Sequence, residues 1–298
     1  MQDKYKVNLN AEQHKYYTQP YEVKSVTTIL KRLAKPMLPA AAVKATVEYL
    51  QENNLDVKKD EKEIKGHYRK KWDNMANLGT LIHHGMEYMT YNRKAKNKLT
   101  NKGITEEIIS YAQTHGIEID EYMDRCIKIC VPNAHKWMKG FNLEFVEIEK
   151  TVNYGDHFAG TADAVVASTL PNGNKVYYVL DYKTGSNVYV EHAMQIAAYI
   201  KALPQYNGSW AGGIIVHINR DTGEISSYYL KMSFINQAYA VFENFMQADM
   251  LIPALEEDLQ TGIKAEKQRI KEEKESQSKK SEDASQHKNA DKLKNNKK

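Results

Sequence analysis

The sequence predicts an α/β protein in which a layer of helices precedes a β-sheet. Apolar residues recur at helical spacing in segments near 39–52, 59–76, 77–92, 104–115 and 118–139. The pattern then changes to β-branched and aromatic runs near 142–153, 158–168 and 175–183, which are typical of strands. We therefore expect a helical layer over 39–140 and a sheet core over 141–230.

Further elements are expected on both sides of these regions. At the N-terminal end, residues 6–9 and 14–17 predict a short hairpin, and Ser25 or Thr27 can cap a helix that follows. After the acidic strands, the spacing of Ala193, Ile196, Ala197 and Ile200 predicts a helix over 189–203. Two more strands are expected at 210–218 and 224–230, around a turn at 219–223, and a closing helix from 233 to 258 or beyond.

The composition indicates a globular protein. The chain has 298 residues, of which 42% are hydrophobic and 27% charged, and it contains neither an internal repeat nor a linker in its middle. We expect one domain over 1–262, closed by the helix of 231–262, and a charged, disordered tail over 263–298. Since no run of eighteen apolar residues and no secretion signal occur, we expect no membrane contact and a cytoplasmic location, in a bacterium or a phage-infected host.

Positive charge is concentrated at the C-terminal end. Residues 264–298 carry twelve Lys or Arg and seven Asp or Glu, whereas the remaining 263 residues carry 30 and 31. A nucleic-acid-binding groove in the body must therefore be a local basic patch. The tail either adds weak, salt-dependent affinity for nucleic acid or has no role. Cys126 and Cys130 are too few for a four-cysteine cluster and are expected to be buried thiols.

Two acidic residues and a lysine lie on neighbouring predicted strands. Asp163 belongs to the strand of 158–168, and Asp181 and Lys183 belong to the strand of 175–183. A hairpin of these strands could bring the two carboxylates side by side. Since side chains alternate along a strand, Asp181 and Lys183 point to one face and Tyr182 to the other. Two carboxylates that share a divalent cation, with a lysine beside them, suit phosphodiester hydrolysis.

Other polar pairs flank this hairpin in the sequence. His83 and Glu87 lie one helical turn apart, and so do Gln195 and Tyr199 on the helix after the Asp181 strand. His83 could bind a metal ion or serve only a structural role. Gln195 and Tyr199 could hydrogen-bond phosphate oxygens, although such residues occur on many helices. Glu149 could add a carboxylate or belong to a solvated strand edge.

The order of these motifs resembles that of a known enzyme superfamily. The chain reads GTxxHxxxE from Gly79, GTAD from Gly160, DYKTG from Asp181 and QxxxY from Gln195. This series resembles the PD-(D/E)XK nucleases, and specifically the RecB-like branch that includes the mitochondrial genome maintenance exonuclease. The resemblance covers roughly residues 20–230 and implies a restriction-endonuclease-like mixed central β-sheet flanked by helices.

The resemblance also implies roles for individual residues. His83, Asp163, Asp181 and the backbone carbonyl of Tyr182 would bind the metal. Lys183 would orient or activate the attacking water, while Gln195 and Tyr199 would contact the substrate at the strand end. The remaining candidates, for a supporting role, are Glu87, Glu149 and Thr184. The cofactor implied is Mg²⁺ or Mn²⁺, and an iron–sulfur cluster is not expected because its four cysteines are absent.

The implied activity is that of a metal-dependent deoxyribonuclease. We expect an exonuclease on single-stranded or frayed DNA ends, because the helical layer of relatives forms a passage for a strand with a free end. Recombination, repair or phage DNA processing is the implied setting, with any partner among recombination or replication proteins left open. The alternatives are a structure-specific or restriction-type endonuclease, a non-catalytic nucleic-acid-binding module, and a structural protein in which Asp181 and Lys183 merely pair.

Overall fold

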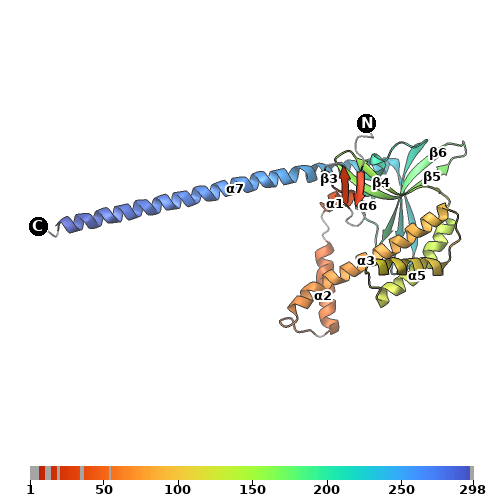
Figure 1. The fold of residues 1–298 in the computed structure, drawn as a ribbon, viewed down its shortest axis with the longest axis horizontal. Coiled ribbons are helices and arrows are strands. Elements are labelled where there is room, and N and C mark those ends of the chain that lie inside the picture. The colour runs from red at the N-terminus through yellow and green to blue at the C-terminus, as the bar shows by residue number, and fades with distance from the viewer. Residues whose placement is uncertain (1–6, 11–14, 19–20, 34–36, 54, 296–298) are drawn as a thin grey trace. The chain divides into compact units, whose positions relative to one another are not determined.

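The protein combines an N-terminal helical region with a five-stranded mixed sheet (Figure 1). The computed structural model describes residues 7–10, 15–18, 21–33, 37–53 and 55–295. The helices are α1 (Val26–Leu30), α2 (Met37–Asn53), α3 (Glu61–Lys94), α4 (Asn101–Thr114), α5 (Glu121–Gly140), α6 (Val190–Ala202) and α7 (Met232–Asn295). The strands are β1 (Val7–Asn10), β2 (Lys15–Thr18), β3 (Tyr21–Val23), β4 (Glu144–Tyr154), β5 (Phe158–Thr169), β6 (Lys175–Thr184), β7 (Ser209–Ile218) and β8 (Ile225–Lys231).

The sheet has the strand order β4-β5-β6-β7-β8, and only β6 and β7 are parallel. Hairpin connections suffice for the antiparallel neighbours, whereas parallel strands need a crossover. Helix α6 supplies that crossover between β6 and β7. The parallel register sets Ile218 beside Thr184, so the loops after β6 and β7 leave the sheet at the same edge.

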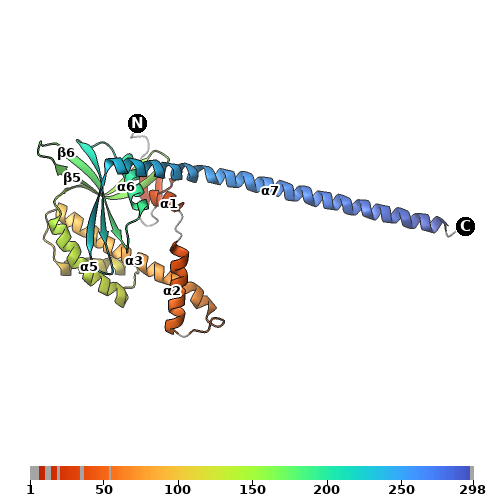
Figure 2. The same cartoon turned by 180° about the vertical axis from the view of Figure 1, so that it is seen from behind.

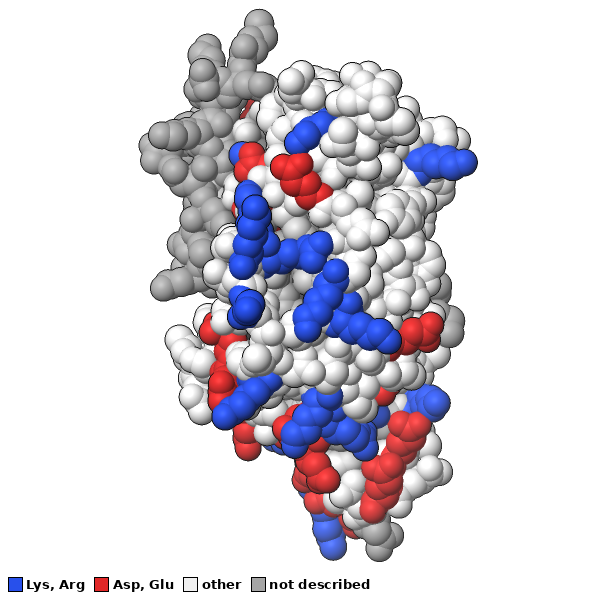
Figure 3. All heavy atoms as spheres, turned by 90° about the vertical axis from the view of Figure 1, so that its right-hand side faces the viewer, with Lys and Arg blue, Asp and Glu red and all other residues white. Residues whose placement is uncertain are grey.

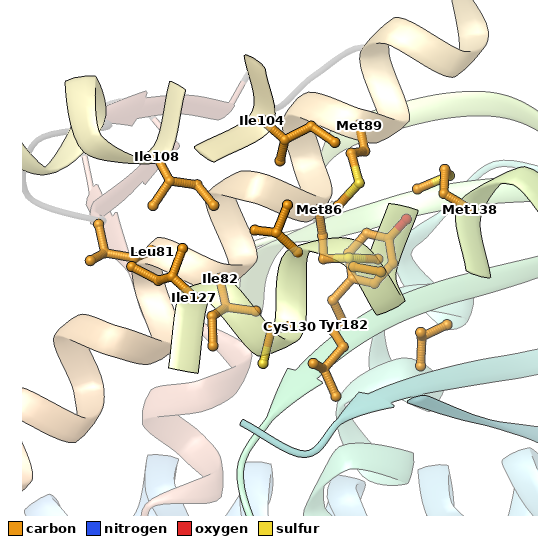
Figure 4. Close-up of a cluster of buried hydrophobic side chains, with 14 of the residues drawn as sticks. Leu81, Ile82, Met86, Met89, Ile104, Ile108, Ile127, Cys130, Met138 and Tyr182 are labelled. Carbon is orange, nitrogen blue, oxygen red and sulfur yellow. The ribbon is translucent and has the colours of Figure 1, made fainter. Parts of the chain in front are cut away.

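Helices cover both faces of the sheet and form a separate core on each (Figures 1 and 2). On one face, α3, α4 and α5 pack against the sheet through a cluster that includes Met86, Ile108, Leu180 and Tyr182 (Figure 4). The buried Tyr182 hydroxyl contacts the Thr90 hydroxyl of α3 at 2.7 Å. On the other face, α1, α6 and the beginning of α7 form the second core. Both faces of the central strands are therefore buried, which leaves few places for polar side chains.

The N-terminal elements agree largely with the sequence. The hairpin predicted at 6–9 and 14–17 is present as β1 and β2, apart from Lys6 and His14, which lie outside the described residues. Strand β3 adds a third strand that was not predicted, since three residues are too few for a periodic signal. Of the two candidate caps for α1, Ser25 is the one whose hydroxyl accepts from the Thr28 backbone N–H, at 3.1 Å.

One boundary prediction is wrong. The helices predicted at 59–76 and 77–92 form one continuous helix, α3, because no helix-breaking proline separates them. Gly79 lies inside this helix, where glycine normally lowers stability. The close approach of β6 explains it: a Cβ atom at Gly79 would lie 2.9 Å from the Thr184 hydroxyl oxygen. At Gly79, helix α3 therefore lies directly against the last residue of β6.

The chain divides into two compact units within α7, one up to Met246 and one from Gln247 onward. The expected closing helix is present, and it continues to Asn295. The predicted domain boundary after residue 262 and the disorder of the tail stay predictions. Within the described ranges, every helix is too short or too polar to cross a membrane.

Candidate metal centre

Asp163 and Asp181 lie next to each other at the middle of the sheet. Strands β5 and β6 pair with Ala164 opposite Leu180, and continuing that register by one residue sets Asp163 opposite Asp181. The backbone N–H of Tyr182 donates to Asp163 Oδ2 at 2.6 Å. That hydrogen bond fixes the Asp163 carboxylate toward the end of β6, where Asp181 and Lys183 point to the opposite face from Tyr182.

His83, Glu149 and Asp163 bring three potential ligand atoms within 4.8 Å of one another. His83 Nε2 on α3 lies 3.7 Å from Asp163 Oδ1 and 3.9 Å from Glu149 Oε1. These distances are too long for hydrogen bonds. Two ligands of one Mg²⁺ can lie up to about 4.2 Å apart, twice the metal–oxygen distance. The spacing of these three residues therefore fits a shared cation with little movement.

Asp181 is the most buried ionisable residue of the group. It is 0% exposed, and neither carboxylate oxygen has a hydrogen-bond partner among the described residues. The Lys183 ammonium lies 2.7 Å from Asp181 Oδ2 and forms a salt bridge with it. A buried carboxylate without hydrogen bonds is costly unless a cation faces it. Lys183 is such a cation, and the donor set of His83, Glu149 and Asp163 is the part of the site that fits a divalent metal ion.

Glu149 has a strained backbone. Its φ is +48°, in the left-handed region that a residue with a side chain rarely adopts. The pairs on either side, Ile148 with Ala164 and Lys150 with Ala162, set it opposite Asp163. Such strain persists only where the surrounding structure enforces it and is common at functional sites. The sequence predicted only a supporting role for Glu149. A positive φ within a strand does not change the periodicity of the sequence, so this strain could not be predicted from it.

The charges of the group shift one another's pKa values. Burial raises the pKa of Asp163 and of Asp181 above the ordinary value, against the opposing effect of the nearby cations. Burial alone would lower the pKa of His83, but the charges of Asp163 and Glu149 raise it to about 9. Burial alone would likewise lower the pKa of Lys183, but the charges of Asp181 and Asp163 raise it above its ordinary value. Without a metal ion, protons on His83 and Lys183 balance the carboxylates.

Gln195 and Tyr199 lie behind the carboxylates, on α6. Both are buried, and the Gln195 side-chain N–H donates to the Tyr199 hydroxyl at 2.8 Å. A Cβ atom at Gly160 would lie 2.4 Å from the Tyr199 ring, so this glycine lets the ring approach β5. Burial is the largest cause of the raised pKa of Tyr199, and the negative charge of Asp181 is the second. The two residues thus bond to each other and support the site from behind.

A cavity of about 590 Å³ opens in front of the centre. Its polar lining includes His83, Glu87, Glu149, Lys183, Thr184 and Arg220. Glu87 Oε2 lies 3.8 Å from His84 Nδ1, so it faces its neighbour on α3. Of the predicted ligands, His83 and Asp163 are therefore grouped with Glu149, whereas Asp181 pairs with Lys183 and is not part of that group. Glu87 and Thr184 line the cavity together with His83 and Lys183.

Arg220 was missed by sequence reasoning. It lies in the turn after β7, and its Nη1 donates to the Met75 carbonyl at 3.3 Å while its buried Nε has no partner among the described residues. The sequence shows this segment only as a turn. Its proximity to the site depends on the parallel pairing of β6 and β7, which local patterns do not reveal.

The fold and this group of residues define an α/β protein with a candidate metal centre. Residues 61–209 match the family model described as "Protein of unknown function (DUF2800)". This range is half of the chain, so the protein belongs to the DUF2800 family. No curated protein matches the chain. The matched range contains every site residue predicted from the sequence, and Arg220 lies beyond it.

Proposed function

We propose that this protein is a metal-dependent deoxyribonuclease of the RecB-like branch of the PD-(D/E)XK superfamily, with a restriction-endonuclease-like fold. The observation that carries the proposal is the group of His83, Glu149 and Asp163, whose potential ligand atoms lie within 4.8 Å of one another, together with the buried Asp181–Lys183 pair. The order of the four motifs along the chain supports the same assignment.

Divalent metal is the cofactor we propose. His83, Asp163, Asp181 and the Tyr182 carbonyl would hold Mg²⁺ or Mn²⁺, and Glu149 would add a ligand. The ion would polarise a phosphate oxygen and lower the pKa of a bound water. A single imidazole among oxygen ligands is compatible with Mn²⁺.

Lys183 supplies a fixed positive charge next to the carboxylates. Because the charges of Asp181 and Asp163 raise its pKa, the side chain remains an ammonium at neutral pH. An ammonium cannot accept a proton, but it can hold a water molecule and stabilise negative charge that develops on a phosphate. We assign it this role.

A second cavity supports a strand-shaped substrate. It has a volume of about 930 Å³ and shares Met75 and Arg220 with the cavity at the metal centre. Its charged lining consists of Arg220, Lys62, Lys70 and Lys71 together with Glu63, Asp120 and Asp221. Lysine and arginine side chains position nucleic acid through its phosphates. We infer that a DNA strand runs from the metal centre past Arg220 toward these lysines. Figure 3 shows Lys and Arg side chains gathered around the middle of one face of the molecule, with basic and acidic side chains intermixed below them.

The test uses end-labelled linear and circular single-stranded DNA with Mg²⁺ or Mn²⁺. We expect metal-dependent cleavage that Asp181→Asn or Lys183→Ala abolishes, with little loss of DNA binding. The matched control is Asp156→Asn, an exposed acid in the turn between β4 and β5. Cleavage of the linear strand alone supports an exonuclease, and equal cleavage of the circle establishes the endonuclease alternative. DNA binding without any cleavage by the native protein would leave the non-catalytic alternative, and unchanged cleavage by both variants would refute the site.

A further inference from the structure

Two hydrogen bonds join Gly185, the residue after β6, to strand β7. The Gly185 backbone N–H donates to the Ile218 carbonyl at 3.3 Å. The His217 imidazole Nε2 lies 3.0 Å from the Gly185 carbonyl oxygen. Since a carbonyl oxygen only accepts, Nε2 carries the proton and donates it. Both backbone groups of Gly185 are therefore bonded to the neighbouring strand.

His217 lies beside Lys183 on the sheet. The parallel register pairs the two residues, and side chains at paired positions project from the same face. It is the face covered by α6, since Ile215, two residues before His217, belongs to the second core. His217 is only 8% exposed, so its ring occupies interior space next to the end of β6.

The end of β6 is thus held on both faces of the sheet. On the α3 side Thr184 lies against Gly79, and on the α6 side His217 holds Gly185. A lysine has a flexible four-carbon stem. The Lys183 ammonium therefore keeps one position only if its backbone is fixed as well as its ion-pair partner, Asp181.

We propose that His217 is a positioning residue for Lys183. Its hydrogen bond to Gly185 fixes the backbone after Lys183 and so keeps the ammonium at Asp181, where Lys183 lines the cavity in front of the metal centre. Its effect on cleavage rests on the proposed nuclease function. Its effect on the Lys183 ammonium does not, and can be measured in the metal-free protein.

The test compares two substitutions of nearly the same length. In His217→Gln the side-chain amide nitrogen is as many bonds from the backbone as Nε2 of histidine, so the donor is kept, whereas His217→Met removes it. The matched control is His135→Met on α5. His135 is also buried, at 6% exposed, and its Nδ1 contacts Asn101 Oδ1 at 2.6 Å, but it does not line the cavity at the metal centre. Thermal unfolding checks that each variant folds.

Two measurements on the metal-free protein address the position of Lys183 directly. Hydrogen exchange reports the protection of the Gly185 amide, and nitrogen-15 NMR reports the Lys183 ammonium, assigned with Lys183→Arg. We expect His217→Met to accelerate exchange at Gly185 and to shift or broaden the ammonium signal. His217→Gln should preserve both, and His135→Met should change neither. An unchanged signal in His217→Met would overturn the inference, as would an equal change in His135→Met or in His217→Gln.

Cleavage of linear single-stranded DNA gives the consequence for the reaction. A small displacement of a group that contacts the reacting atoms lowers the rate, so His217→Met should reduce kcat by about tenfold to a hundredfold, with KM nearly unchanged. His217→Gln should recover most of the loss. A native kcat in His217→Met would overturn the positioning role. If the native protein cleaves no DNA, the proposed function fails, and the exchange and NMR measurements still decide the role of His217.

Discussion

At the scale of single residues, the site is organised around the cost of burying Asp181. Its carboxylate is fully buried, and its pKa is raised by that burial even though Lys183 lies beside it. A raised carboxyl pKa means that the ionised form is less stable in the folded protein than in the unfolded chain. The metal-free protein therefore keeps a destabilising charge at this position.

The first prediction is that Asp181→Asn stabilises the metal-free protein while it removes metal binding. The amide keeps the shape of the side chain and removes the buried charge, for a gain of about 1–2 kcal/mol in the free energy of unfolding. Thermal unfolding in EDTA measures the gain, and titration with Mn²⁺ should shift the melting temperature of the native protein only. Asp156→Asn, on the surface, should change neither quantity. Destabilisation by Asp181→Asn would show that its pair with Lys183 stabilises the fold.

The second prediction is that stabilisation by Mg²⁺ or Mn²⁺ grows between pH 6.5 and 8.5. The pKa of His83 is raised from 6.5 to about 9, so this residue contributes stability below pH 6.5 that is lost as the pH rises through 9. A metal ion must displace that proton, which costs about tenfold in affinity for each pH unit below the pKa. Isothermal titration at several pH values gives the slope. A constant affinity over this range would contradict a metal-bound His83.

These residues differ in how far the sequence could predict them. Asp181 and Lys183 are two apart on one strand, so their common face follows from the chain alone. The proximity of Asp163 follows from the hairpin, because a short turn joins two recognisable strands. For Glu149 the sequence predicted only a supporting role, because its left-handed backbone depends on how β4 pairs with β5. Arg220 could not be found without the tertiary pairing of β6 and β7.

At the scale of elements, α3 carries His83 and contacts the end of β6 closely where Gly79 meets Thr184. The sequence predicted two helices here, at 59–76 and 77–92, with Gly79 near the start of the second. In the structure the glycine is required by Thr184 of the neighbouring strand rather than by a turn. Local patterns identify a glycine but not the surface that faces it.

The third prediction compares two glycines of α3. Gly66→Ala should stabilise the protein by about 0.5–1 kcal/mol, since alanine favours helix and nothing lies within 4 Å of the new Cβ. Gly79→Ala adds the same propensity but places its Cβ 2.9 Å from the Thr184 hydroxyl oxygen. It should give less stability than Gly66→Ala and reduce cleavage, because Thr184 adjoins Lys183. Equal stabilisation by both substitutions would contradict the tight contact between α3 and β6.

The fourth prediction concerns the turn between β7 and β8. Arg220→Gln should weaken binding of single-stranded DNA and lower the slope of log affinity against log salt by about 0.7, the value for one lost phosphate contact. The measurement uses the Asp181→Asn background, so that DNA is not cleaved. Arg125→Gln, which removes an arginine outside both cavities, is the control. An unchanged slope would place the strand elsewhere on the surface.

At the scale of the whole molecule, the order of helices and strands was predictable because each element has its own periodicity. The central sheet is mixed and flanked by helices, as the resemblance implied. The length of α7 was not predicted: residues after 262 lack apolar spacing apart from Ile263 and Ile270, and their composition resembles that of a disordered tail. Charge is divided along the chain in the same place, with a nearly neutral body followed by a basic end.

The fifth prediction follows from that division of charge. Residues 278–298 contain seven lysines and three acids, so replacing these lysines with glutamine should weaken DNA binding at low salt. Neutral side chains release fewer counterions from DNA, so the loss should shrink as salt increases. Cleavage at saturating substrate should not change, because the metal centre lies in the other unit. Fluorescence anisotropy at several salt concentrations, in the Asp181→Asn background, measures the effect while chain length stays constant. An affinity equal to that of the parent at every salt concentration would show that the body alone binds DNA.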